Sequence, residues 1–156
     1  MASRGRAPAR KLVPWLLLAA WLVIIYCFSD QPYSGRTTQR FLGAVMNVPV
    51  RKAAHFLEYL ILFVLWRNAL AARRAPGRAL ARSDAAILAT IACAALDEWH
   101  QSFVPGRSPA VADVLIDSAG ALAGFALLVL LASRRSCRRR AEQAGRAGGR
   151  ADEPGR

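Results

Sequence analysis

The chain has 156 residues, of which 54% are hydrophobic, and it carries a formal net charge of +12. A soluble domain of this length rarely combines so large an apolar fraction with so large a charge, whereas a membrane protein does so when apolar runs alternate with charged linkers. The three cysteines, Cys27, Cys93 and Cys137, match no disulfide framework and no zinc-binding spacing, so we interpret them as structural.

Four apolar stretches are long enough, or nearly so, to cross a bilayer core of about 30 Å. They are residues 12–28, 53–72, 84–103 and 111–132. The first follows a basic segment, residues 1–11, and resembles a signal peptide, but it is long for one and no small-residue cleavage site follows it. The sequence therefore predicts an all-α fold, a polytopic bundle of four transmembrane helices over residues 12–132.

The segments outside these stretches differ in kind. Residues 29–51 are long for a hairpin, and Phe41, Leu42, Val45 and Met46 fall on one helical face. This pattern predicts a short amphipathic helix in the membrane interface. Residues 133–156 are rich in Arg, Gly and Ala, which predicts a basic, disordered tail.

Basic residues indicate the orientation of the bundle. Four precede the first stretch, five lie around the linker between the second and third, and eight lie in the tail, which places 17 of the 22 Lys and Arg on one side. Arg36, Arg40, Arg51, Lys52 and Arg107 lie on the other. The sequence thus predicts a multi-pass protein of the bacterial inner membrane with both termini in the cytoplasm. We interpret the basic tail as a topology anchor near anionic lipid rather than a nucleic-acid arm.

Polar residues gather at the predicted outer ends of three stretches. They are Lys52, His55, Glu58, Asp97, Glu98, His100, Gln101, Asp113 and Asp117, with Arg107 in the adjoining turn. Charged groups at membrane depth cost free energy and need partners or water. They indicate either a network that holds the helices together or a binding site for a polar ligand, and we favour the site because ionisable residues in membranes usually serve function.

Spacing orients one part of this cluster. Asp113, Asp117, Gly120 and Gly124 follow one another at intervals of four, three and four residues, which places them on one helical face. The two glycines form a G-x-x-x-G pattern that permits close packing against a neighbouring helix. We therefore expect the two aspartates to face the bundle.

The cluster also contains candidate ligands for a divalent metal, namely His55, Glu58, Glu98 and Asp113. Imidazole and carboxylate groups suit such an ion, but the spacing matches no specific metal motif. Ser102 and Ser108 lie nearby, and no feature of the sequence marks either as an activated nucleophile.

Three motifs carry a family resemblance. RKAAHFLEY at 51–59, ALDEWHQSFVPGRS at 95–108 and ADVLIDSAGALAG at 112–124 resemble the VanZ-like membrane protein family, as does FSDQP at 28–32. The resemblance covers residues 12–132 and implies that Lys52, His55, Glu58, Glu98, Gln101, Arg107, Asp113 and Asp117 are functional positions. Many members carry Asn at the position of Asp117. The family is named for a member linked to teicoplanin resistance, and the resemblance implies no established reaction.

Three functions follow as hypotheses. In the first, an outward-facing pocket binds a lipid head group, a cell-envelope precursor or a lipoglycopeptide, and contributes to glycopeptide resistance. In the second, the protein is a metal-assisted hydrolase or transferase that acts on a lipid-linked substrate. In the third, it is a structural or assembly subunit. A homo-oligomer is compatible with each.

Overall fold

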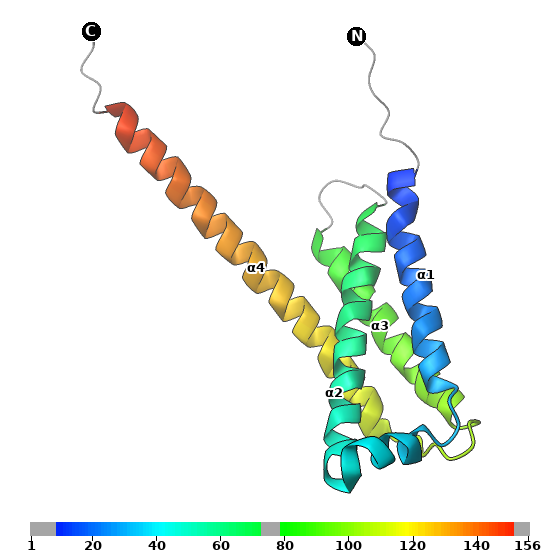
Figure 1. Cartoon of the computed structure of the whole chain (residues 1–156). Helices are drawn as coiled ribbons and strands as arrows, with labels where there is room; N and C mark the ends of the chain where they lie inside the picture. The colour runs from blue at the N-terminus through cyan, green and yellow to red at the C-terminus, as the bar shows by residue number, and fades with distance from the viewer. Residues whose placement is uncertain (1–8, 73–78, 152–156) are drawn as a thin grey trace. The chain divides into compact units, whose positions relative to one another are not determined.

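The computed structural model describes residues 9–72 and 79–151. These residues form the helices α1 (Ala9–Ser29), α2 (Ser34–Ala72), α3 (Ala79–Gln101) and α4 (Val111–Ala151), and they contain no strand. The prediction of an all-α fold is confirmed. The turns after α1 and after α3 lie at the same end of the bundle (Figure 1). Residues 1–8, 73–78 and 152–156 lie outside the described residues, and so does part of the predicted basic side.

α2 consists of two helical pieces that meet at Gly43. This residue has φ 74° and ψ 166°, a left-handed conformation that favours glycine. Residues 34–42 therefore run across the ends of the other helices, while residues 44–72 run along them (Figure 1). The break separates Phe41 and Leu42 from Val45 and Met46, so the predicted amphipathic face is not one continuous helix.

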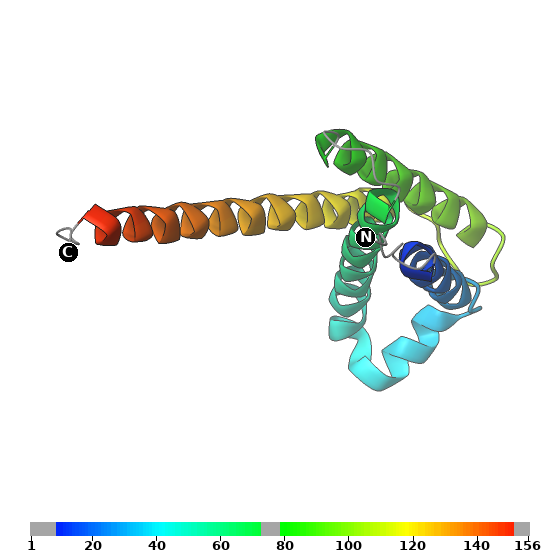
Figure 2. The same ribbon diagram turned by 90° about the horizontal axis from the view of Figure 1, so that it is seen from above.

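The core lies where α1, α2 and α3 meet. α2 packs against both α1 and α3, whereas α1 and α3 contact each other only slightly. Tyr59, Leu62 and Ala69 of α2 are buried together with Leu18 and Ile25 of α1 and with Ala94 of α3. The indole of Trp21 donates a hydrogen bond to the backbone carbonyl of Glu58 at 3.1 Å. α2 is thus the central helix, and Figure 2 shows the bundle from above.

Gly120 and Gly124 bring the first part of α4 against α2. A Cβ at Gly120 would collide with the backbone carbonyl of Phe56. A Cβ at Gly124 would lie 2.8 Å from the ring of Phe63 and 3.3 Å from the carbonyl oxygen of Leu60. The two helix backbones therefore approach closely along the stripe that also carries Asp117.

The chain divides into two compact units, Met1–Phe125 and Ala126–Arg156. The bundle and its polar residues belong to the first unit. In the second, the helix continues through the basic segment to Ala151, where composition predicted disorder. Arginine, alanine, glutamate and glutamine all favour helix, and Arg138 pairs with Glu142 one turn later at 2.9 Å.

Two of the described helices are long and apolar enough to cross a membrane, over Lys11–Ser29 and Val111–Gln143. Most of their residues are not buried in the protein: Leu16 and Val23 of α1 and Leu115 and Leu122 of α4 are all more than half exposed. Apolar side chains that face outward in this way fit a lipid surface better than water. α2 and α3 carry more charged residues, and the four-span arrangement stays a prediction.

Candidate functional site

A cavity of about 450 Å³ opens where the end of α1 meets the two pieces of α2 and the turn before α4. This volume lies in the range of small-ligand sites. Its apolar lining comes from α1 and α2 and includes Trp21, Ile24, Phe28, Leu57 and Ile61. Its polar lining includes Ser29, Ser34, Thr38, Arg51, His55, Glu58 and Arg107. One part of the cavity therefore suits hydrocarbon and another suits a charged group.

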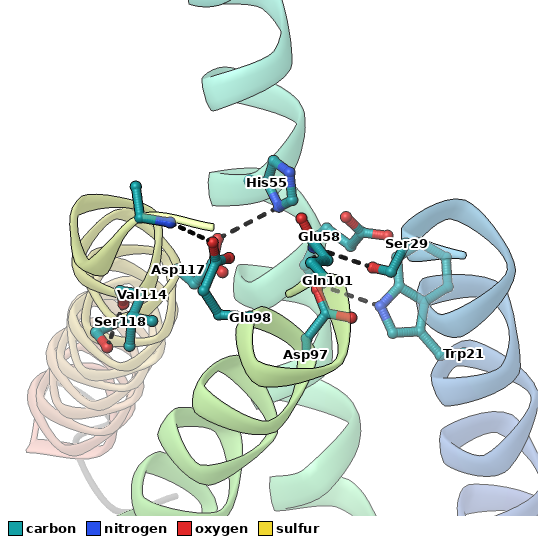
Figure 3. A network of polar contacts seen from close by, with 11 residues as sticks. Trp21, Ser29, His55, Glu58, Asp97, Glu98, Gln101, Val114, Asp117 and Ser118 are labelled. Atoms are coloured by element: carbon teal, nitrogen blue, oxygen red, sulfur yellow. Dashed lines mark hydrogen bonds and ion pairs between the residues drawn. The ribbon is translucent and has the colours of Figure 1, made fainter. Parts of the chain in front are cut away.

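His55 of α2 faces Asp117 of α4 across the bundle (Figure 3). Its Nδ1 lies 3.7 Å from Oδ1 of Asp117, which is too far for a hydrogen bond. Within the described part of the chain, neither atom has a hydrogen-bond partner, although Asp117 is only 1% exposed. Burial of a carboxylate oxygen without a hydrogen-bond donor costs free energy. The space between His55 and Asp117 therefore favours a bound proton or a ligand group that hydrogen-bonds to both.

Glu98 joins the end of α3 to the start of α4. Its Oε1 accepts a hydrogen bond from the backbone N–H of Ala110 at 2.5 Å, and the carbonyl of Ala110 accepts one from the N–H of Asp113 at 2.8 Å. Glu98 is 8% exposed. Its charge therefore meets the positive end of α4, where an anion is stabilised. This contact gives Glu98 a structural role whatever else it does.

Two further side chains tie the turns to α1. The amide of Gln101 donates to Oδ2 of Asp97 at 2.8 Å and to the hydroxyl of Ser29 at 3.3 Å. The guanidinium of Arg107 donates to the carbonyl of Phe28 at 2.6 Å, at the negative end of α1. The C-terminal end of α1 is thus held by side chains from a distant part of the sequence.

A second cavity of about 190 Å³ lies beside the first. Arg51, His55 and Arg107 line both cavities, and Lys52 and Asp113 line only the smaller one. The nearby charges that act on His55 come from Asp97, Asp113, Arg107 and Arg51. The structure thus brings together most of the polar residues that the sequence singled out.

His100 does not join this group. Its Nε2 lies 3.3 Å from Oδ1 of Asp30, and its ring packs on Tyr26 with 5.0 Å between centroids. His100 and Asp97 line a different cavity of about 310 Å³, between α1 and α3. In the structure His100 thus lies apart from His55, because the rotation of α3 turns it toward α1.

The metal-ligand hypothesis gains no support from the arrangement of side chains. Across residues 9–72 and 79–151, no three His, Cys, Asp or Glu side chains lie close enough together to hold a metal ion. Glu98 is already engaged by the backbone of Ala110, and His55 approaches Asp117 rather than Glu58. The proposed set of His55, Glu58, Glu98 and Asp113 is therefore not assembled in this structure.

Sequence reasoning missed the contribution of α1 and of Arg51. Trp21, Ile24 and Phe28 line the larger cavity, and they follow one another at intervals of three and four residues. That spacing marks one helical face and could have been recognised in the sequence. Arg51 lies within the first motif, but only the fold shows that its side chain faces the cavity.

Comparison with known proteins identifies a family for this chain. The family model described as VanZ/LLP1 matches residues 14–132, which include all of the candidate site residues. No curated protein matches the chain, and no solved structure does.

Proposed function

The chain belongs to the VanZ/LLP1 family, and from this premise we propose that it is a multi-pass protein of the bacterial inner membrane whose outward-facing pocket binds the polar head of an envelope amphiphile. The ligand is a lipid, a lipid-linked cell-wall precursor or a lipoglycopeptide such as teicoplanin. Binding of the last, or protection of its target, would contribute to glycopeptide resistance.

One observation supports this proposal above the others. The larger cavity combines an apolar wall from α1 and α2 with Arg51, His55, Glu58 and Arg107 in one space. An amphiphile needs both kinds of surface at once, because its head must be hydrogen-bonded and its chain must leave water. A site for a small hydrophilic solute would not need the apolar wall.

The test fills the cavity without removing a charge. The protein is purified in mild detergent, and amphiphiles bound to it are detected by native mass spectrometry. Ile61→Trp places an indole in the cavity, whereas the control Leu122→Trp changes an exposed residue of α4 that does not line it. We expect the wild type and the control to retain bound amphiphile and Ile61→Trp to lose it. Equal retention by all three proteins would contradict the proposal.

A structural or assembly role is the second candidate, and specific contacts favour it. Glu98, Gln101 and Arg107 each connect helix ends that are far apart in sequence. The carboxylate of Glu58 accepts no hydrogen bond from the described residues. If the polar residues serve only to connect the helices, substitution of Glu58 should therefore have no effect on growth in teicoplanin. The ligand-binding proposal expects Glu58→Gln to change that growth.

A further inference from the structure

We propose that this pocket selects a phosphate-bearing amphiphile, with the phosphate held between Arg51 and Arg107 and the hydrocarbon laid along the Trp21, Ile24 and Phe28 face of α1. The inference rests on the proposed function, because it names the ligand class for the same cavity. It adds a role for Arg51, which lies in the first motif but was not among the candidate site residues, and for a face of α1.

The first step concerns two cations that share one space. Arg51 and Arg107 line both cavities, and in the described part of the chain neither guanidinium lies within 4.0 Å of a carboxylate oxygen. Burial lowers the pKa of Arg107, and the like charge of Arg51 lowers it further, against the opposing effect of Asp97, Glu98 and Glu58. An anion between the two guanidinium groups would relieve this repulsion.

The second step concerns how many donors remain. One terminal nitrogen of Arg107 donates to Phe28, while its buried Nε has no hydrogen-bond partner among the described residues. Arg51 makes no hydrogen bond within the described chain through any of its side-chain nitrogens. Two guanidinium groups with unused N–H donors match the several oxygens of a phosphate, which arginine binds with paired hydrogen bonds.

The third step concerns the space around Arg51. The residue opposite its head is Gly35, in the piece of α2 before the break. A Cβ there would lie 2.9 Å from Nη1 of Arg51, so a side chain at this position would displace the guanidinium. The fold thus keeps Arg51 beside the cavity and packed against residues 34–42.

The fourth step concerns the apolar wall. Ile24 and Phe28 are 39% and 59% exposed, although they line a cavity with charged groups. Leu57 and Ile61 of α2 face the same space. A volume of about 450 Å³ takes a phosphate head and the first part of a chain, and the rest of the chain then continues along the exposed apolar face of α1. Free phosphate would leave this wall uncovered.

The experiment uses the full-length protein in detergent and native mass spectrometry with four probes. They are phosphatidylglycerol, phosphatidylethanolamine, diacylglycerol, which lacks phosphate, and inorganic phosphate. We expect binding of the two phospholipids at least tenfold tighter than that of diacylglycerol or phosphate alone. Arg51→Gln should weaken phospholipid binding on the order of tenfold, the usual effect of removing one charged hydrogen-bonding group. The matched control is Arg40→Gln, an exposed arginine outside the cavities.

The outcomes separate this inference from the proposal on which it rests. Tight binding of diacylglycerol that Ile61→Trp abolishes and Arg51→Gln leaves unchanged would overturn the phosphate inference and leave the amphiphile pocket in place. Phosphate binding as tight as phospholipid binding would show an anion site without a chain site and overturn the inference as well. Binding of no probe, with wild type and Ile61→Trp indistinguishable, would overturn both.

Discussion

Replacement of Gly120 by alanine tests whether the backbones of α2 and α4 are in contact. An added methyl group would collide with the carbonyl oxygen of Phe56, which belongs to the backbone and cannot rotate away. Overpacking of this kind usually costs about 1–3 kcal/mol, while the change from glycine to alanine returns about 1 kcal/mol of helix propensity. We therefore expect a net loss of about 0–2 kcal/mol.

Gly124→Ala is the matched control, because it adds the same methyl group to the same stripe one turn later. There the nearest atom is Cδ1 of the Phe63 ring at 2.8 Å, and a side chain can shift. We expect Gly120→Ala to be less stable than Gly124→Ala by about 1–2 kcal/mol, because helix propensity cancels between them. Stability is measured by SDS titration of the protein in mixed micelles, with helix content followed by circular dichroism. Equal stability of the two variants would refute the close approach of these backbones.

Three further predictions follow from the polar contacts. Glu98→Ala should lower the free energy of unfolding by about 1–2 kcal/mol in the same titration, because the N–H of Ala110 loses its acceptor. Glu98→Gln keeps an acceptor and should lower it less, so equal losses for the two variants would argue against this contact. Asp117→Asn should raise the melting temperature by a few degrees, because burial of a carboxylate without a donor destabilises the folded state. A lower melting temperature would show that the charge of Asp117 is needed for folding. Ser108→Cys, in a chain from which Cys27 and Cys93 are removed, should react with a membrane-impermeant maleimide in intact cells, whereas Cys137 should react only after permeabilisation. The reverse pattern would place the cavity on the cytoplasmic side.

The helices were largely predictable because apolar runs set them. The first expected stretch begins and ends within a few residues of α1, and the second and third end within a few residues of the ends of α2 and α3. These ends were predictable because linkers rich in Pro, Gly or charge interrupt the apolar stretches. The glycine stripe allowed the prediction that Asp117 faces the bundle, whereas the approach of Asp117 to His55 of α2 is seen only in the structure. The spacing of residues along one helix therefore predicted which face of that helix packs into the bundle.

Other features depend on tertiary packing and could not be predicted. Nothing in the residues around Gly43 distinguishes a break from a glycine tolerated within a helix. His100 lies three residues after Asp97, and only the rotation of α3 against α1 decides that it meets Tyr26 and Asp30. The basic segment after Ser133 has a composition typical of disorder and also residues that favour helix, and the second property prevails in the structure.

The hydrogen bonds that hold the end of α1 have a consequence for biosynthesis. The carbonyl of Phe28 receives its donor from Arg107, 79 positions later, and Ser29 receives one from Gln101, 72 positions later. A ribosome releases the chain from its N-terminus, so these two acceptor groups of α1 have no donor until about two thirds of the protein exists. This end of the bundle therefore closes late, and a nascent chain stalled before residue 107 would expose the unfinished site to quality-control proteases.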